Sequence, residues 1–425
     1  ESQFIAHLVA RGVKSVENLM LASSVTREMN PTVVSFILAQ ENLRRLDFHF
    51  NNERRFDRDN DRLMLEMTTE SSSLQQSLEY LSVDVSCANS DFCCMKDLRE
   101  LCIHAETVEL KRLVIPSWIV SLQLCVGLVN ESVENDDILS RGNSSLHFPC
   151  IKVLKLRGNF KFLSWMLSAC GATLQQLDLQ ATRNEQQQRA RQNNDDDEET
   201  FDNVELVMNS SFPNLNDLTL QDIVSRDVVQ HLTVQLLGSN NNRHRVVQNL
   251  SFIQSYLMDE SIIGDIESIK RFTGPISMFH QLKNSALREL RRIVFLDDYE
   301  MFDSTIEKLL SCSRLEQLSS YSVESVEGSQ FSRLLQELRQ LRKIDFEIAT
   351  IPTFSLYHKV DERPLLLQKV KLDLCHLDCQ SIESLCSSMP HLRELTSFAN
   401  RHTIAQFISV VNGLSNRYSP CSCPT

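Results

Sequence analysis

The chain has 425 residues, of which 42% are hydrophobic and 23% charged, so it is long enough to bury a large core. Its formal net charge of −13 argues against a general nucleic-acid-binding surface, because neutralising phosphates requires clustered Lys and Arg. Thirteen irregularly spaced Cys do not form the pattern of a disulfide framework and favour a reducing, intracellular compartment, cytoplasmic or nuclear.

The first predicted strand lies at Val16-x-x-Leu19-x-Leu21. Residues 1–15 before it contain one short apolar segment, which we interpret as a partial N-terminal cap or the end of a missing upstream segment. We call the middle apolar residue of this apolar-x-x-apolar-x-apolar pattern the anchor. The same pattern recurs along the chain with anchors at Leu19, Leu46, Leu81, Leu113, Leu154, Leu177, Leu218, Leu250, Ile293, Leu318, Ile344, Val370 and Leu395.

The spacing of the anchors indicates a repeat architecture. The last five, at positions 293, 318, 344, 370 and 395, are separated by 25, 26, 26 and 25 residues. A possible further row at Leu98-x-x-Leu101-x-Ile103 lies 12 residues before Leu113, and one of these two rows would be a short strand without a helix. The pattern alone does not choose between them. The apolar stretch from Val114 to Val129 fits a strand followed by a buried helix.

Helices are predicted between the strands. Val33, Val34, Ile37 and Leu38 follow Pro31 at helical spacing, and Pro favours the first turn of a helix. The long step from Leu250 to Ile293 leaves residues 262–279 as an extra helix or a protruding loop. Residues 401–425 are predicted to be a C-terminal capping helix and tail.

Residues 183–202 form a polar, acidic insert whose composition cannot support a packed core, so we expect a disordered loop. Its acidic run, 195–199, is either a docking site for a basic partner or a tolerated expansion of a surface loop.

A small polar residue is expected five positions after each anchor, where it can turn inward and bond the backbone of neighbouring turns. Nine of these thirteen positions are small and polar or Cys, and four are not. The positions are Ser24, Asn51, Ser86, Trp118, Asn159, Thr182, Ile223, Ser255, Asp298, Val323, Ala349, Cys375 and Asn400.

Over nearly its whole length the chain resembles the leucine-rich-repeat superfamily. The period near 26, Cys375 at a turn and the ending Cys-x-x-Met-Pro-x-Leu at 386–392 are similar to the cysteine-containing subtype found in F-box receptors of ubiquitin ligases. The resemblance implies an α/β solenoid over residues 16–400, a curved horseshoe with a parallel β-sheet on the concave face and helices on the convex face. An F-box is not recognisable in residues 1–23.

Signatures of enzymes are missing from the sequence: it has no His-Glu-x-x-His, Gly-x-Ser-x-Gly, Gly-x-x-x-x-Gly-Lys or Gly-x-Gly-x-x-Gly motif. We therefore expect no catalytic residues, no cofactor and no metal. The nearest metal-like cluster is Cys375, His376 and Cys379, which the turn and the helix core already explain. No run of about 20 apolar residues indicates a membrane span.

Function in this architecture comes from side chains one and three positions after each anchor, which point outward from the concave face. The predicted protein-binding residues are Asp47, His49, Lys155, Arg157, Asp178, Gln180, Thr219, Gln221, Asp345, Glu347, Lys371 and Asp373. Their mixed charge favours a polypeptide partner over nucleic acid or membrane.

Within that class, the resemblance favours a non-catalytic substrate-recognition subunit of a ubiquitin ligase. Such a subunit would meet a Skp-type adaptor and a cullin through a segment not visible in this sequence. Two alternatives stay open. One is a scaffold subunit of a larger complex, and the other is a GTPase-activating protein of the leucine-rich type, which would need a catalytic Arg at a strand end.

Overall fold

The computed structural model describes residues 7–23, 31–50, 67, 74–88, 91–108, 113–129, 148–170, 172–181, 211–223, 226–237, 247–255, 260–296, 299–300, 303–321, 323–347, 366–373, 384, 388–389 and 391–397. The chain divides into two compact units. The first comprises Glu1–Gly238 with Gln254–Tyr256, and the second comprises Ser239–Ile253 with Leu257–Thr425. The insert at 183–202, the capping helix and tail at 401–425 and Cys375 lie outside the described residues.

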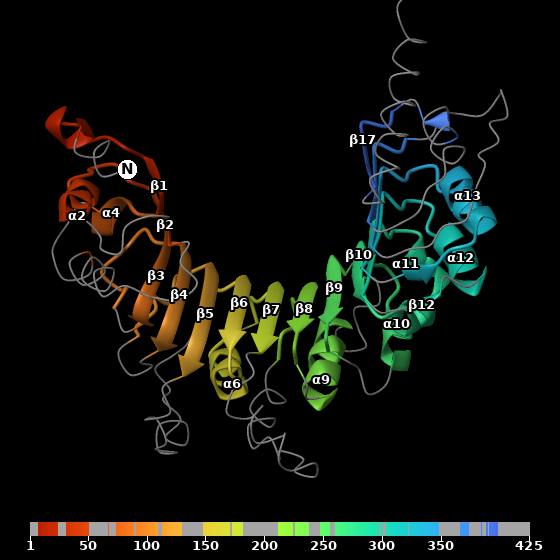
Figure 1. The fold of residues 1–425 in the computed structure, drawn as a ribbon. Helices are drawn as coiled ribbons and strands as arrows, with labels where there is room; N and C mark the ends of the chain where they lie inside the picture. The colour runs from red at the N-terminus through yellow and green to blue at the C-terminus, as the bar shows by residue number, and fades with distance from the viewer. Residues whose placement is uncertain are drawn as a thin grey trace, which may run out of the picture. The chain divides into compact units, whose positions relative to one another are not determined.

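The first unit contains parallel strands that follow one another in chain order, so each strand pairs with the next (Figure 1). They are β1 (Asn18–Ser23), β2 (Arg45–Phe50), β3 (Tyr80–Ala88), β4 (Glu100–Val108), β5 (Ser121–Val129), β6 (Val153–Gly158), β7 (Gln176–Ala181) and β8 (Asp217–Gln221).

The second unit repeats the arrangement in its own strands, again parallel and in chain order (Figure 1). They are β9 (Asn249–Ile253), β10 (Arg271–Gly274), β11 (Arg292–Phe295), β13 (Gln317–Ser320), β15 (Lys343–Glu347), β16 (Lys369–Asp373) and β17 (Glu394–Ser397). Two short strands, β12 (Tyr299–Glu300) and β14 (Val323–Ser325), pair separately.

The register of the strands confirms twelve of the thirteen predicted anchors, because all except Leu113 lie in strands of this sheet order. Leu154 pairs with Leu177, and Leu177 pairs with Leu218. These three side chains are 0% exposed. Burying a Leu side chain contributes roughly 1.5–3 kcal/mol relative to leaving it exposed, and a slip of one residue would turn every anchor to the other face. The anchors therefore set the register.

The predicted row at Leu113 is wrong. Strand β4 uses Leu101 as its anchor, paired with Leu81, and strand β5 uses Leu122, paired with Leu101. Val114 makes only an isolated bridge with Asp91, and Trp118 lies in a turn before β5, so it is not an inward rung. The predicted helix within 114–129 is therefore a strand. The period-2 alternation of Leu122-Gln123-Leu124-Cys125-Val126 produces it.

Residues 262–279 are also more regular than predicted. They hold a short 3-10 helix, η2 (Glu260–Asp265), then strand β10, then helix α10 (Ile276–Gln281). Phe272 is the anchor of β10, pairs with Leu250 and Ile293, and is 0% exposed. The apolar-x-x-apolar-x-apolar pattern does not include this anchor, because Gly274 stands where the third apolar residue is expected.

Helices join the strands and lie on one face of the sheet within each unit (Figure 1). The first unit contains α2 (Pro31–Leu38), α4 (Leu74–Ser77), α6 (Phe160–Ser168) and α9 (Arg226–Leu237). The second contains α10, α11 (Asn284–Leu287), α12 (Asp303–Leu310) and α13 (Gly328–Glu337). Helix α2 begins at Pro31 and buries Val33, Val34 and Ile37, as predicted. None of the described helices is long and apolar enough to cross a membrane.

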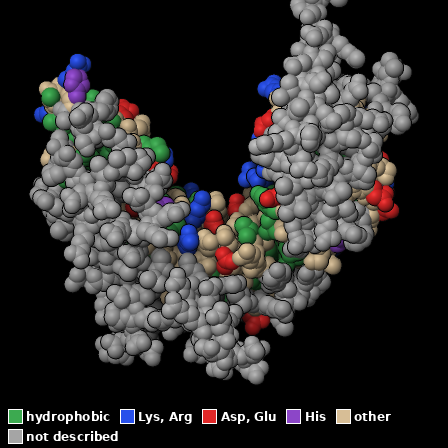
Figure 2. Space-filling view, in the orientation of Figure 1, with side chains coloured by type: hydrophobic (Ala, Val, Ile, Leu, Met, Phe, Trp, Pro, Cys, Tyr) green, Lys and Arg blue, Asp and Glu red, His purple; other side chains and the backbone are tan. Residues whose placement is uncertain are grey.

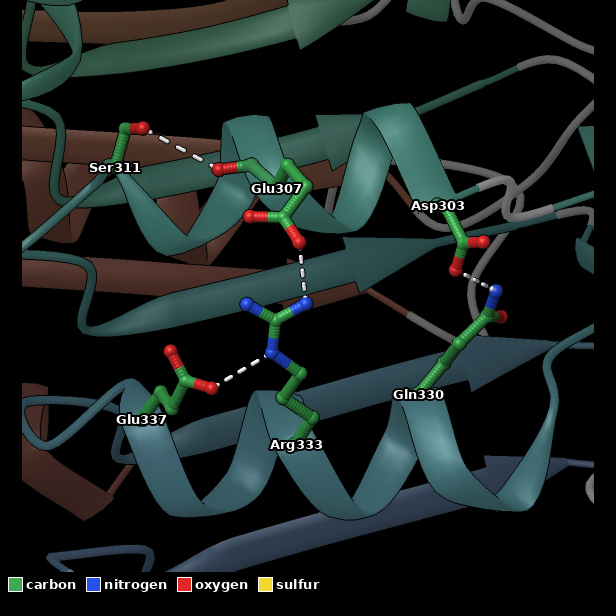
Figure 3. Close-up of polar contacts among 6 residues, drawn as sticks. All are labelled: Asp303, Glu307, Ser311, Gln330, Arg333 and Glu337. Carbon is green, nitrogen blue, oxygen red and sulfur yellow. Dashed lines mark hydrogen bonds and ion pairs between the residues drawn. The ribbon is translucent and has the colours of Figure 1, made fainter.

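Neighbouring helices of the second unit are joined by exposed polar contacts (Figure 3). Arg333 of α13 bonds Glu307 of α12 and, 2.7 Å away, Glu337 one turn along its own helix. Gln330 Nε2 donates to Asp303 Oδ1 over 2.7 Å. Phe331 and Leu334 of α13 are 0% exposed, so burial of the apolar side supplies most of the packing energy, and the exposed ion pairs add orientation.

One of the polar residues five positions after an anchor makes the expected hydrogen bond to the backbone of a neighbouring repeat. The hydroxyl of Ser255 accepts the backbone N–H of Ile223 over 3.0 Å, and Ile223 is the residue in the same position one row earlier. Asn159 instead caps its own helix, because its Oδ1 accepts the N–H of Phe162 over 2.9 Å. Most of the other side chains five positions after an anchor lie outside the described residues.

Candidate functional site

In the strands whose burial alternates, side chains one and three positions after the anchor lie on the face of the sheet opposite the buried anchors. We call this the open face. In β6, β7 and β8 the burial alternates, with buried anchors and half-buried or exposed residues between them. This alternation follows from the pleat of a strand, in which successive side chains point to opposite faces.

Six of the twelve predicted binding residues lie on three adjacent strands of the first unit. Lys155 pairs with Asp178, and Asp178 pairs with Thr219. One step further along the strands, Arg157, Gln180 and Gln221 form a second row. In Figure 2, blue Lys and Arg side chains gather over β6, with red and tan side chains beside them.

The charges in these two rows are incompletely matched. Burial raises the pKa of the Asp178 carboxyl, and the neighbouring Lys155 opposes that shift. Neither Lys155 nor Arg157 makes an ion pair with any residue that the structure describes. This part of the open face therefore presents two cations and two amides that can bond a partner.

A polar cluster on the neighbouring strands β3, β4 and β5 was not predicted. His104 Nδ1 lies 3.0 Å from Asp84 Oδ1, and its Nε2 lies 3.2 Å from Gln123 Nε2 and 3.6 Å from Cys102 Sγ. Gln123 Nε2 also donates to Cys125 Sγ over 3.7 Å. These residues stand at the open-face positions after Leu101 and Leu122, so correct assignment of those two anchors would have found them.

The groups around His104 change its pKa. The hydrogen bond that His104 donates to the Asp84 carboxylate raises the pKa of His104 well above its usual 6.5, with Cys102 and Cys125 adding to the shift and burial opposing it. Carboxylate, imidazole and thiol stand here in the order used by cysteine nucleophiles, but Cys102 is only 9% exposed. The arrangement favours a positive charge on His104 of β4, which β5 separates from the strand that carries Lys155 and Arg157.

Among the predicted binding residues of the second unit, Asp345 is partly neutralised within the sheet. Asp345 lies 3.0 Å from the Nζ of Lys343 and 3.6 Å from the Nζ of Lys371. Glu347 pairs in register with Asp373, whose side chain lies outside those described. The sequence could not show that Asp345 and Lys371, separated by one repeat, neutralise each other.

Asp47 lies on β2, the second strand of the first unit. It is 9% exposed and pairs in register with Ser82. Arg45 lies 4.0 Å from the Asp47 carboxylate and places its guanidinium 3.8 Å from the centre of the Tyr80 ring. Asp47 is thus built into the sheet, while the side chain of His49 lies outside those described.

No group of three or more His, Cys, Asp or Glu suited to a metal ion occurs among the described residues. The cluster of Cys375, His376 and Cys379 lies outside them.

Comparisons with known proteins give structural similarity only. No family model matches the sequence, and no curated protein matches it. A solved leucine-rich-repeat protein of Leptospira interrogans is 13% identical, with 92% of this chain and 98% of that chain covered and a TM-score of 0.37.

Two further solved structures cover a smaller share of the other chain. TLR13 in complex with ssRNA13 is 11% identical, covering 89% of this chain and 54% of that one, with a TM-score of 0.38. The leucine-rich-repeat ectodomain of the Arabidopsis thaliana receptor kinase GASSHO1/SCHENGEN3, in complex with CASPARIAN STRIP INTEGRITY FACTOR 2, is 14% identical, covering 92% and 46%, with a TM-score of 0.30.

The fold class follows from the chain's own geometry. Parallel strands in chain order, anchors stacked in register and helices on one face define an α/β leucine-rich-repeat solenoid.

Proposed function

We propose that this protein is a non-catalytic interaction module that binds a polypeptide on the open face of its first unit. The observation that carries the proposal is the pair of cations on β6, Lys155 and Arg157, which have no ion-pair partner among the described residues. Gln180 on β7 pairs in register with Arg157, and Gln221 on β8 pairs with Gln180, so their amides lie in one row with Arg157.

The surface suits an extended, mixed-polarity partner. Adjacent strands lie about 4.8 Å apart, so the side chains of β6, β7 and β8 offer contacts at regular intervals across the strands. Cations that make no ion pair with the described residues, beside a half-buried carboxylate and amides, favour a partner that offers carboxylates and hydrogen-bonding groups in a matching order.

The test compares two charge-reversal variants of the same size. Lys155→Glu with Arg157→Glu alters the open face, whereas Arg11→Glu with Lys96→Glu makes the same charge change at exposed positions away from it. Partners of the tagged wild-type protein are captured from cells and identified by mass spectrometry, and binding of each purified partner is then measured directly. We expect the control to retain binding and the open-face variant to lose at least tenfold in affinity. Equal binding by both variants would refute the proposal.

We further propose, from the sequence resemblance, that the partner is a substrate of a ubiquitin ligase. The support is the Cys-x-x-Met-Pro-x-Leu segment at 386–392 and Cys375. Co-purification of the full-length gene product with a Skp-type adaptor and a cullin tests this directly. Their absence, with another stable partner present, would instead favour a scaffold subunit of a larger complex.

A further inference from the structure

The strands of the second unit begin with a concentration of cations. The two positions before each anchor, from β10 to β17, hold eight Lys or Arg, two Glu and two Gln. We call the cations the basic edge. They are Lys270, Arg271, Arg291, Arg292, Arg342, Lys343, Lys369 and Arg393.

Backbone hydrogen bonds hold these positions in a fixed order. From β11 to β17, two successive N–H groups donate to one carbonyl of the preceding repeat, as Arg291 and Arg292 do to Lys270 O, over 2.9 and 3.2 Å. Arg342 and Lys343 bond Glu316 O in the same way, over 2.8 and 3.0 Å. The strand pairing thus brings two successive residues of each repeat to one edge of the sheet, about 4.8 Å from the next pair.

Most of the cations make no ion pair within the described part of the chain. Arg291 lies 3.5 Å from Glu316, Lys369 lies 2.6 Å from Glu394, and Lys343 lies 3.0 Å from Asp345. The other five make no ion pair with any described residue: Lys270, Arg271, Arg292, Arg342 and Arg393. All four of those Arg side chains are exposed.

The arrangement is unfavourable for the isolated protein. Arg271 pairs in register with Arg292, and like charges directly opposite one another on neighbouring strands are destabilising. The chain as a whole carries −13, so composition does not account for a row of cations here. An anionic ligand lying across the strands would relieve the repulsion.

We propose that the basic edge is a binding site for an acidic polypeptide segment. A guanidinium forms two parallel hydrogen bonds with one carboxylate, and five of the eight cations are Arg. An extended chain advances about 3.3 Å per residue, so three residues cover about the distance from one strand to the second strand along. A run of Asp or Glu can therefore follow the edge.

A single-stranded nucleic acid fits the described surface less well. Sites for single strands combine cations with aromatic side chains on which bases stack. Among the described residues, no aromatic side chain stands two before, one before or one after any of these anchors.

This site is separate from the proposed open-face function, because it uses different residues on the other unit. Either proposal can fail without the other.

The test measures binding of a fluorescently labelled 20-residue polyglutamate peptide to the full chain by anisotropy, at low and high salt. The edge variant is Arg271→Gln, Arg292→Gln and Arg342→Gln. The matched control is Arg11→Gln, Lys14→Gln and Lys96→Gln, which removes the same charge from exposed positions elsewhere. A third variant replaces the same three arginines by Lys, which keeps the charge and shows whether substitution at these sites disturbs folding.

We expect the edge variant to lose at least tenfold in affinity, the control to stay within about twofold, and the Lys variant to keep most of the binding. Binding of the wild type should weaken steeply as salt rises, because exposed charges are screened. The proposal is overturned if the wild type does not bind polyglutamate, if edge and control variants bind equally, or if a single-stranded oligonucleotide of equal length binds more tightly than the peptide.

Discussion

His104 on β4 is hydrogen-bonded across the sheet to Asp84 on β3, with 3.0 Å between Nδ1 and Oδ1. The two residues are 20 positions apart in the sequence, and they meet because the two strands pair in register at this point. A carboxylate so placed holds the imidazole in its charged form.

The His104 pair should make stability depend on pH. The pKa of His104 is raised above 6.5 in the folded chain, so the folded state keeps a proton that the unfolded state releases. The stabilisation is fully present below pH 6.5 and is lost as the pH rises toward the folded pKa. We expect His104→Gln to cost about 1 kcal/mol at pH 6, since the pair is partly exposed, and less at pH 9. Urea midpoints measured at both pH values test this.

The matched control for that measurement is His7→Gln, at an exposed position. It should leave the midpoint unchanged at both pH values. A difference between wild type and His104→Gln that stays constant from pH 6 to pH 9 would contradict the assignment of a charged imidazole.

Phe272 should be a major contributor to the core of the second unit. It is 0% exposed, and its ring centre lies 6.1 Å from that of Phe279, which in turn lies 5.2 Å from that of Phe295. Phe272→Ala should destabilise by roughly 3–5 kcal/mol, whereas Thr273→Ala on the open face should change stability by less than about 0.5 kcal/mol. Chemical denaturation of both variants distinguishes them, and equal effects would show that Phe272 is not an anchor.

Ser255 should stabilise the turn that follows β9. Its buried hydroxyl accepts the N–H of Ile223, so Ser255→Ala leaves a buried donor without that acceptor. We expect a loss of about 1–3 kcal/mol, and faster hydrogen exchange at the Ile223 amide. Ser304→Ala, at an exposed position of α12, serves as the comparison and should have little effect. Unchanged exchange at Ile223 would show that the hydrogen bond is not formed.

The cysteines should react with iodoacetamide in an order set by burial. Burial raises the pKa of Cys312 to about 12, and burial together with Asp91 raises the pKa of the exposed Cys93 to about 11. Because the thiolate is the nucleophile, Cys150, which is exposed, should be labelled first at pH 8, then Cys93, with Cys312 last. Peptide mass spectrometry over time gives the order, and labelling in urea should abolish it.

The sequence predicted the strands where its apolar pattern was regular. From Ile293 to Leu395 every anchor was found, since each repeat there has nearly the same length. It left the choice between Leu101 and Leu113 open, and it missed Leu122 and Phe272. Leu101 and Leu122 belong to short repeats of 20 and 21 residues, measured from Leu81 to Leu101 and from Leu101 to Leu122, and Phe272 is followed two residues later by Gly274 instead of an apolar residue.

That failure also hid part of the candidate site. Gln123 could be recognised as the neighbour of Lys155, and Cys102 and His104 as residues one strand further away, only once β4 and β5 had been placed between β3 and β6.

The amino-acid sequence by itself determined the architecture of this protein, because an apolar residue at a fixed place in each repeat can be buried only if the strands stack in register. The tertiary structure decided which charges remain available to a partner. Asp345 is neutralised by lysines of its own and the next strand, while Lys155 and Arg157 find no such partner among the described residues. Ion pairing depends on what the neighbouring strand places within about 4 Å, and that neighbour is one repeat away in the chain.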